Sequence, residues 1–424
     1  MDLFTALQTS VSGLQAQSYA ISNISGNIAN SQTTGYKRVD TSFVDMMSET
    51  TPKREVAGSV LAQSQLTNTI AGNVVASSVP TNMSISGSGF FTVVQKTGDA
   101  NGAATFSGTN AYTRRGDFAP TAEGYLMNGA GGYLTGNNLD PLTGQVTGAG
   151  PIMVGNPTLP AQPTTTITYS ANLPATPTTS ALTTPPNSIA GPSITAYTAS
   201  GAPVAINTRW SQVSTSATGS TWKLSYDSGT TGNPTWTDVA TQFTFDQTGK
   251  LTAPAATGTP PTNTVDLSGD TFSGYTFTNL KLDISGGLTQ YADATGAVTT
   301  STLSQDGATS GTLTSVAVGT DGKINGTFSN GAVKTLATVG IAQFANPDGL
   351  KADSKGNYLQ TADSGPPLAG LDGSTITGAS NEQSNTDIAT EFSKMIVTQQ
   401  AYSANTRVMS TAQTMMSDLL NVIR

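Results

Sequence analysis

The chain has 424 residues, a formal net charge of −8 and only 10% charged residues, against roughly 25% in an average soluble protein. It has no cysteine and no histidine, so the side chains that most often hold zinc, and the commonest general base, are absent. The net charge is negative and the sequence contains no cluster of basic residues, and both features argue against nucleic-acid binding. We therefore expect no metal, no cofactor, no catalytic residue and no nucleic-acid partner.

The amino-terminal segment has an unusual distribution of charge. No charged residue occurs from Leu3 through Tyr36, and then Lys37 and Arg38 follow together. This segment contains too many Ser, Asn, Gln and Thr residues for a membrane span. It also lacks the basic start and continuous apolar core of a cleaved signal peptide. We expect no membrane insertion, and an export route, if the protein leaves the cell, that removes no leader.

Apolar residues recur with heptad spacing at both ends of the chain, which is typical of helices that pair. The amino-terminal stripe consists of Leu7, Leu14, Ile21 and Ile28. The carboxy-terminal stripe consists of Ile388, Met395, Tyr402, Met409, Met416 and Ile423. Ser384 and Asp387 form an S-x-x-D pattern, which predicts a capping box ahead of the second helix. We predict a coiled coil whose stripes form the seam of self-assembly; the alternative is an ordinary helical hairpin packed on a β core.

The middle of the chain has the pattern of β structure. Residues 316–342 alternate short apolar runs with Asp-Gly and Asn-Gly turns, as an antiparallel meander does. Residues 155–200 are rich in Pro, Thr, Ala and Ser, which indicates a boundary followed by long loops.

The predicted fold class is a multidomain α+β protein, with a terminal α-helical coiled coil plus a split core β domain that contains an inserted outer β domain. The predicted boundaries are 1–30 and 384–424 for the helical domain, 31–75 for an extended connector, 76–169 and 296–383 for the core β domain, and 170–295 for the outer domain.

Three patterns are candidate ligand or catalytic sites. The sequence GSGFF at residues 87–91 lacks the Gly-Lys-Ser/Thr of a phosphate-binding loop, and predicts a tight turn into a buried strand. Asp321, Asn325 and Asn330 have the wrong spacing for a calcium loop and are predicted to be hairpin-turn residues. A glycosidase-like pair of carboxylates is an alternative that the sequence leaves open.

Four segments are more specific than these patterns. They are SGLQAQSYAISNISGNIANSQTTGYKR (12–38), ISGSGFFTV (85–93), YTRRGDFAPTAEGYLMNGAGGYLTG (112–136) and SNEQSNTDIATEFSKMIVTQQAYSANTRVMSTAQTMMSDLLNVIR (380–424). In this order they resemble the motifs of the bacterial flagellar rod and hook protein family. Residues 301–350, together with the large central insertion, resemble the hook-type members in particular. Residues 170–295 carry no such resemblance beyond their size and β character.

The resemblance implies a structural protein, exported by the flagellar type III apparatus, that assembles with copies of itself into a curved tube on the cell exterior. This tube joins rod to filament and transmits torque as a flexible universal joint, with the terminal helices lining its inner wall. The implied partners are the distal rod protein, the hook cap protein and the hook–filament junction proteins. A distal rod-type axial protein is the alternative within the family, and a secreted β-rich adhesin is the alternative outside it.

The resemblance also marks turn and motif residues. They are Gly35, Gly87, Gly89, Phe90 and Phe91. We expect Gly35 to supply a backbone angle that other residues resist. Lys37 and Arg38 would then return the chain to a wetter environment.

Overall fold

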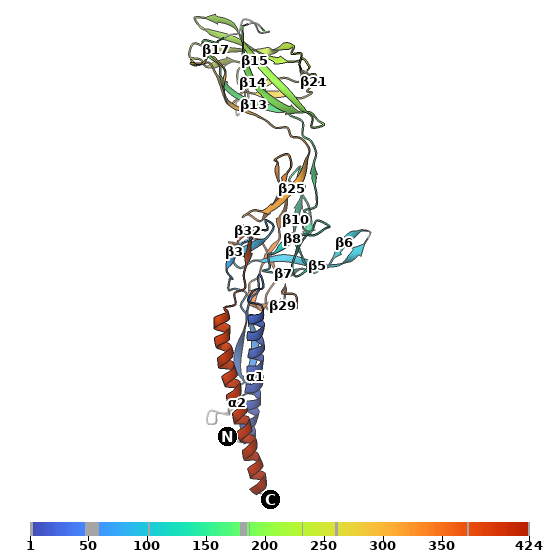
Figure 1. Cartoon of the computed structure of the whole chain (residues 1–424), viewed down its shortest axis with the longest axis vertical. Helices are drawn as coiled ribbons and strands as arrows, with labels where there is room; N and C mark the ends of the chain where they lie inside the picture. Colours follow the sequence, from blue (N-terminus) through green and yellow to red (C-terminus); the bar gives the residue numbers. More distant parts are fainter. Residues whose placement is uncertain are drawn as a thin grey trace. The chain divides into compact units, whose positions relative to one another are not determined.

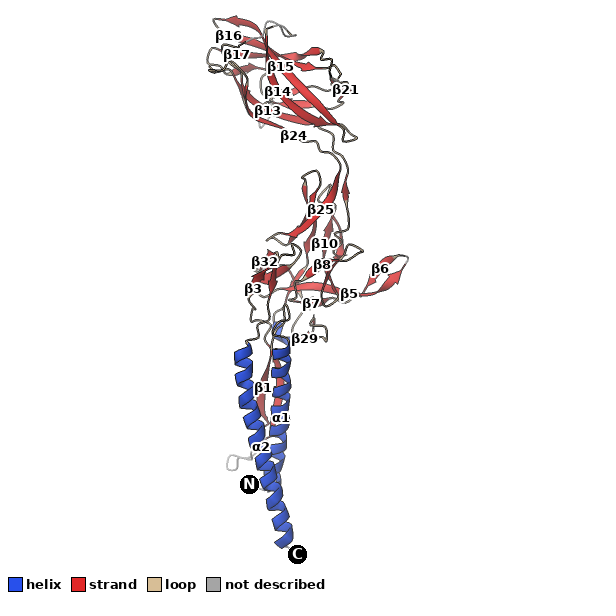
Figure 2. Ribbon diagram, in the orientation of Figure 1, coloured by secondary structure: helices blue, strands red, loops and turns tan. Residues whose placement is uncertain are grey.

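A computed structural model of the chain describes residues 3–46, 59–100, 102–178, 185, 187–230, 232–258, 262–370 and 373–422. Figure 1 traces the chain from the amino-terminal helix (blue) to the carboxy-terminal helix (red). Figure 2 shows that strands make up most of the structure between these two helices. The fold is therefore mostly β, with one helix at each end of the chain.

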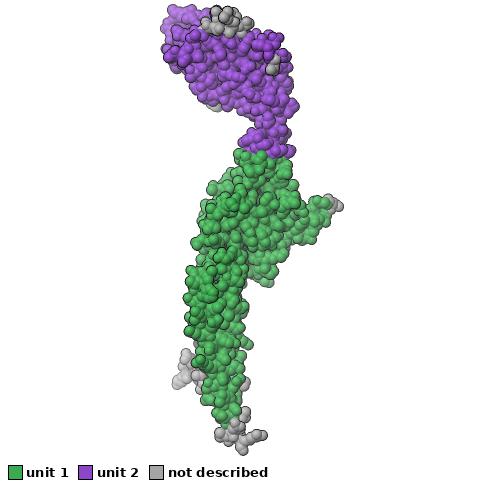
Figure 3. Space-filling model, in the orientation of Figure 1, with its two compact units in different colours: residues 1–157, 313–327, 333–424 green, residues 158–312, 328–332 purple. Residues whose placement is uncertain are grey.

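The chain divides into two compact units, coloured separately in Figure 3. Unit 1 comprises residues 1–157, 313–327 and 333–424, and unit 2 comprises residues 158–312 and 328–332. Unit 1 thus contains both ends of the chain, and the sequence of unit 2 interrupts it.

The two helices belong to unit 1 and lie in contact along each other. α1 spans Leu3–Ala29 and α2 spans Ile388–Val422. α1 contains no charged residue, and its small and apolar side chains recur every three or four positions, which places them on shared faces. Within the described residues, neither helix has the length and apolarity needed to cross a membrane.

Two strands after α1 form an antiparallel ribbon against that helix. They are β1 (Val39–Met46) and β2 (Ser59–Leu66). Ser12 Oγ donates to the carbonyl of Val60 at 2.8 Å, and Asn23 Nδ2 donates to Thr41 Oγ1 at 2.9 Å. Hydroxyl and amide side chains of this charge-free helix therefore bind a β ribbon. The ribbon lies within residues 31–75, the predicted connector.

Unit 1 also contains a large sheet. Its main path runs through β25 (Gly311–Val318), β26 (Lys323–Phe328), β27 (Val333–Val339), β10 (Gly132–Leu139), β5 (Phe90–Ala100), β7 (Ala111–Thr113), β30 (Tyr358–Leu359) and β29 (Lys351–Ala352). Attached to it are β6 (Ala103–Phe106), β8 (Phe118–Pro120), β9 (Leu126–Asn128), β11 (Val146–Pro151), β28 (Ile341–Gln343) and β31 (Leu368–Ala369), and the short 3-10 helix η1 (Pro347–Gly349) connects β28 to β29. Two short pairs accompany the sheet: β3 (Val74–Ala76) with β33 (Ser380–Glu382), and β4 (Met83–Ser86) with β32 (Thr375–Gly378).

The core of this sheet is centred on the start of β5. Phe90 and Phe91 are both fully buried. The ring of Phe90 packs edge-on against Phe344 and Tyr358, with centroids 6.0 and 5.7 Å apart, and Phe91 packs edge-on against Phe118 at 5.5 Å. Such edge-to-face pairs stabilise a core beyond their buried area. The Gly-Ser-Gly turn before β5 thus delivers two adjacent aromatic side chains into the centre of unit 1.

Unit 2 packs two sheets against each other. The first contains β14 (Ser188–Tyr197), β15 (Pro203–Ser216), β16 (Gly219–Asp227), β17 (Trp236–Asp246) and β18 (Leu251–Ala253). The second contains β19 (Thr264–Asp266), β22 (Lys281–Asp283), β13 (Thr166–Asn172), β23 (Leu288–Thr289) and β24 (Thr299–Gln305). β12 (Thr158–Leu159) pairs with the start of β25, and β20 (Thr271–Phe272) pairs with β21 (Tyr275–Thr276).

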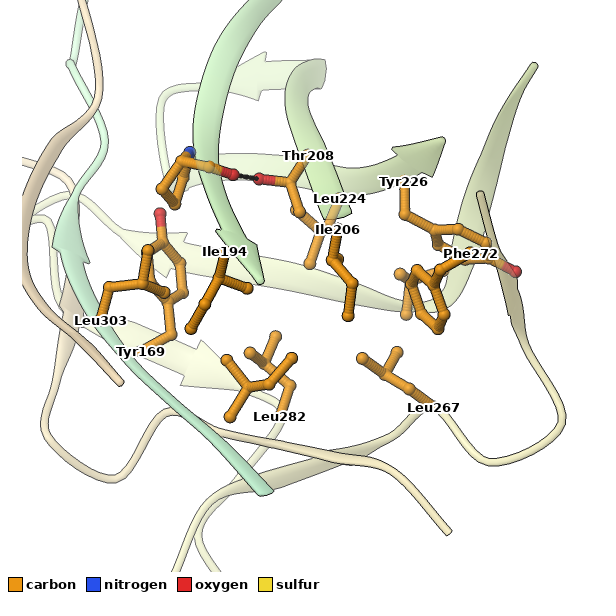
Figure 4. Close-up of a pocket in the computed structure, with 13 residues that line it drawn as sticks. Tyr169, Ile194, Ile206, Thr208, Leu224, Tyr226, Leu267, Phe272, Leu282 and Leu303 are labelled. Atoms are coloured by element: carbon orange, nitrogen blue, oxygen red, sulfur yellow. Dashed lines mark hydrogen bonds between the residues drawn. The ribbon is translucent and has the colours of Figure 1, made fainter. Parts of the chain in front are cut away.

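A small apolar cavity of about 30 Å³ lies in the core of unit 2, between side chains such as Ile206, Leu224 and Leu282 (Figure 4). The hydroxyl of Thr208 at its edge donates to the carbonyl of Pro192 at 2.7 Å. The side chains around the cavity are mostly apolar, and apolar voids of this size stay dry. We interpret it as a packing void and not as a ligand site.

Replacing Phe243 with alanine is expected to destabilise unit 2 by about 3–5 kcal/mol, the usual cost of removing a buried phenyl ring. Phe243 is fully buried and packs edge-on against Trp210 at 4.9 Å. All three tryptophans of the chain (Trp210, Trp222 and Trp236) belong to unit 2, so tryptophan fluorescence during urea unfolding reports on this unit. Val213→Ala, at an exposed position, is the control and should change stability by less than about 0.5 kcal/mol. Equal effects of the two substitutions would contradict this account of the core.

Candidate assembly surface and its anchoring junction

The most buried side chains of α1 and α2 are largely small or polar. The buried residues of α1 with described side chains are Ser10, Ala16, Ala20, Ile24 and Asn27. In α2 the buried residues with described side chains are Glu391 and Ala412. The two helices are in close contact at Gly13, where a Cβ atom would stand 2.9 Å from Asn405 Nδ2. Contact at this position therefore depends on the absence of a side chain.

The predicted stripes occupy more open positions. Seven of their residues are half-buried: Leu7, Leu14, Ile21, Ile28, Met395, Met409 and Met416. Ile388 and Tyr402 are each 41% exposed, and Ile423 lies outside the described residues. α2 exposes further large apolar side chains at Phe392, Ile396, Val397, Val408 and Met415. One chain alone thus leaves much of the apolar surface of α2 exposed to water. The coiled coil and the role of the stripes in assembly stay predictions.

Asn27 forms hydrogen bonds that connect α1 both to the ribbon and to α2. Its Oδ1 accepts hydrogen bonds from the Val39 amide at 2.9 Å and from the Tyr36 hydroxyl at 3.1 Å. Its Nδ2 donates to the Val39 carbonyl at 3.0 Å and to Glu391 Oε2 at 2.9 Å. All four hydrogen-bonding positions of the amide are used. Asn27 is almost fully buried, so neither an apolar residue nor an acid would satisfy these partners.

A buried ionic junction joins three segments that are distant in sequence. Lys37 Nζ lies 2.5 Å from Glu382 Oε1, and Arg114 Nη1 lies 3.4 Å from Glu382 Oε2. The three side chains are between 0% and 2% exposed. Glu382 Oε1 also accepts a hydrogen bond from the Gly72 amide at 2.8 Å. The expectation that Lys37 returns to a wetter environment is therefore wrong, because its ammonium group is enclosed by a distant carboxylate and by backbone.

Two cations share one carboxylate in this junction. Burial lowers the pKa of Lys37 and that of Arg114, and the charge of Glu382 opposes both shifts. The guanidinium of Arg114 lies over the ring of Phe90, 5.1 Å from its centroid, and donates to the Gly87 carbonyl. These contacts disperse part of the excess positive charge.

Glycines allow the backbone to approach this junction. Gly35 has φ +67°, and a Cβ atom on it would lie 2.6 Å from the carbonyl carbon of Arg114. Gly87 has φ +119° and would clash in the same way with Ser374. Such positive φ values favour glycine. At Gly89, a Cβ atom would stand 2.8 Å from Ile341 Cγ2.

The sequence interpretation did not single out Arg114 or Glu382. The sequence nevertheless contained a sign that Arg114 and Glu382 matter. The chain has only 18 basic and 26 acidic residues, and Arg114 and Glu382 lie inside the quoted segments 112–136 and 380–424. A charge in such a charge-poor motif is a candidate for a buried pair.

The residues weighed as a calcium loop form local turn contacts or belong to a strand. Asp321 Oδ1 accepts from the Lys323 amide at 3.1 Å, and Asn330 Oδ1 accepts from the Ala332 amide at 3.1 Å. Asn325 lies within β26, so its prediction as a turn residue is wrong. Among the residues that the structure describes, no cluster of three or more acidic side chains is placed to hold a metal.

The start of α2 differs from the predicted capping box. α2 begins at Ile388, and Asp387 itself is the cap: its Oδ1 accepts from the Thr390 amide at 2.9 Å. Ser384 instead accepts from the Thr386 amide at 3.2 Å. The Thr390 hydrogen bond lowers the pKa of Asp387 below its ordinary value of 3.8.

The cap should make the first turn of α2 sensitive to acid. Because the folded pKa of Asp387 is lowered, the stabilisation is present above 3.8 and is lost as the pH falls through the folded value. We expect the hydrogen-exchange protection of the Thr390 amide to fall in this range. Asp387→Asn keeps a good capping side chain without a titrating group. This variant should lose the pH dependence, and a persistent dependence would assign it to another group.

Two family models match the ends of the chain. One, described as flagella basal body rod protein, matches residues 7–37, and the other, described as flagellar basal body rod FlgEFG protein C-terminal, matches residues 377–422. The matches cover most of both helices and include Lys37 and Glu382 of the junction. Both descriptions indicate a protein of the flagellar basal body rod class.

Relatives that match over their full length identify one family within this class. The flagellar hook protein FlgE of Brucella abortus is 31% identical over 435 residues, covering 100% of both chains. The flagellar hook protein FlgE of Rhizobium meliloti is 28% identical over 450 residues, again covering 100% of both chains, and that of Salmonella typhimurium is 28% identical over 429 residues, covering 97% of this chain and 98% of its own. This chain belongs to the flagellar hook protein FlgE family.

Among solved structures, the Helicobacter pylori flagellar hook protein FlgE2 is similar with a TM-score of 0.49 and 16% sequence identity. The similarity covers 71% of this chain and 98% of that one.

Proposed function

We propose that this chain polymerises through its two helices into the curved tube of the flagellar hook, which joins rod to filament and transmits torque as a flexible joint. The observation that carries the proposal is the apolar surface that α2 leaves exposed, including Ile388 and Tyr402 of the predicted stripe. A single chain does not bury these side chains, and neighbouring copies packed side by side would do so. Burial of about 25 cal/mol per Å² of apolar surface then favours the polymer.

The junction supports a mechanical role for the same chain. The connections from α1 and into α2 converge on Glu382, which is bonded to Lys37, Arg114 and Gly72. Force on the helices would therefore pass into the sheet of unit 1 through buried, charge-assisted bonds, which are stronger than neutral ones. The chain as a whole is poor in charge, so neighbouring β domains would slide past one another with few ionic contacts to break.

The family membership supports further parts of the proposal. We include in it a location outside the cell in the hook of the flagellum, export by the flagellar type III apparatus, and contacts with the distal rod, hook cap and hook–filament junction proteins. Full-length similarity to hook proteins favours this function over the rod-type alternative. A secreted adhesin or a glycosidase does not account for that similarity, and the family is a structural one.

Removing residues 164–306, which include the predicted outer domain, tests whether assembly depends on the terminal helices. Thr158 pairs with Thr312, and Gln162 is bridged to Ala308, so the two strands are already side by side. Replacing residues 164–306 with a short Asn-Gly turn should close them as a hairpin. We expect the purified full chain to form curved tubes at high concentration. The shortened chain should form tubes of altered curvature, both observed by electron microscopy.

Calorimetry should first confirm that the shortened chain is folded. A folded variant that forms no tube would mean that the deleted residues are required for assembly, and would contradict a helical seam. Tubes of unchanged curvature would mean that residues 164–306 do not influence the shape of the tube, contrary to this expectation.

A further inference from the structure

A groove of about 600 Å³ opens between α1, β1 and α2 within unit 1. Each of the three elements contributes an apolar side chain to its walls: Ile24 from α1, Phe43 from β1 and Val397 from α2. Phe43 is 47% exposed and Val397 is 64% exposed. The groove therefore presents apolar walls to water in the isolated chain.

The polar groups of the groove are already paired. Lys394 Nζ lies 2.9 Å from Asp40 Oδ1 and 3.0 Å from Glu391 Oε1, and Arg38 Nε lies 3.3 Å from Asp40 Oδ2. Two cations thus balance two carboxylates. A charged occupant would be taken out of water without a free partner, at a substantial cost. The groove fits an occupant that is apolar and uncharged where it enters.

The same chain carries such an element on α2. Ile388, Phe392 and Ile396 follow at four-residue intervals and are all exposed. An α-helix turns 100° per residue, so these three side chains form one stripe. Lys394 and Val397, which line the groove, lie on the opposite side of the helix by the same geometry. The stripe of a chain therefore points away from its own groove.

We propose that the groove receives the Ile388–Phe392–Ile396 stripe of a second copy of this chain. The proposal rests on the proposed function and assigns the surfaces that would carry it. A stripe and a groove on opposite sides of one helix make a head-to-tail contact, in which every added copy presents a new groove. Contacts of this kind do not make two-fold dimers, and they build open helical assemblies when the rotation between copies does not close a ring.

Cysteine pairs test this contact, because the natural chain contains no cysteine. In tubes of the double variant Phe43→Cys/Ile396→Cys, mild oxidation should join one copy to the next and give a ladder of disulfide-linked oligomers under denaturing conditions. The matched control is Val44→Cys/Ile396→Cys. Val44 is the exposed neighbour of Phe43 in β1, and its side chain points to the other face of the ribbon. The control should give no ladder.

A second measurement does not depend on cysteine. Phe43→Ala should raise the monomer concentration in equilibrium with tubes at least about tenfold, as expected when a buried aromatic contact worth 1.4 kcal/mol or more is lost. Val44→Ala should leave that concentration unchanged. Tubes that form normally but give no ladder with Phe43→Cys/Ile396→Cys, or an equal ladder with the control, would overturn the groove contact and leave the proposed function intact. Absence of tubes from the natural chain would overturn both.

Discussion

Replacing Glu382 with alanine is expected to lower the free energy of unfolding of unit 1 by about 3–5 kcal/mol, the usual cost of removing one partner from a buried ion pair. The reason is that Lys37 and Arg114 are both buried against this carboxylate, and both would lose it. The measurement is hydrogen exchange of the β5 and β33 amides in increasing urea, since the tryptophans report only on unit 2.

Comparing the stability costs of two substitutions tests this prediction more strictly. Lys37→Met removes one cation and leaves Arg114 with Glu382 as a balanced pair, so its cost should be smaller than that of Glu382→Ala. Asp117→Ala is the surface control: Asp117 pairs with Arg115 at 2.7 Å but is partly exposed, and such pairs contribute about 0–1 kcal/mol. A Lys37→Met variant that is less stable than Glu382→Ala would contradict the charge balance described for the junction.

Replacing Tyr402 with aspartate is expected to abolish polymerisation without unfolding the monomer. Tyr402 is 41% exposed on α2, so the isolated chain tolerates a charge there. In a helical seam the same carboxylate would be buried unpaired in every copy, at a cost of several kcal/mol. A cost of about 3 kcal/mol alone raises the monomer concentration in equilibrium with tubes roughly 100-fold.

Sedimentation of tubes and thermal unfolding of the monomer separate these two effects. Tyr402→Phe keeps the apolar ring and should polymerise like the natural chain. If Tyr402→Asp polymerises normally, the exposed face of α2 at this position is not part of the seam. If its monomer unfolds at a much lower temperature, the substitution acts within the chain.

The heptad spacing was sufficient to predict two terminal helices, because apolar residues on a helix keep their period whatever they pack against. It was not sufficient to predict what buries the interface. Gly13, Ala16 and Ala20 form no apolar stripe by size, yet a Cβ atom on Gly13 would meet Asn405 of α2, and both alanines are buried. Their effect comes from the bulk they lack, which a pattern of large apolar residues does not register.

Long-range polar contacts were also beyond the sequence interpretation. Lys37 and Glu382 are separated by 345 residues, and nothing local marks either one as buried. Ser12 and Asn23 appeared to be polar residues of an uncharged helix, but they bind the ribbon that follows. The boundary predicted at 170 depends on composition and the one at 295 on the family resemblance of residues 301–350, and both stay predictions.

Cryo-electron microscopy of tubes grown from the purified chain tests the central claim most directly, because it places every helix relative to those of neighbouring copies. We predict a hollow tube whose innermost layer is made of α1 and α2 from adjacent copies, with Tyr402 buried between them. Tubes whose copies contact one another only through β structure, with Tyr402 exposed to solvent, would contradict it.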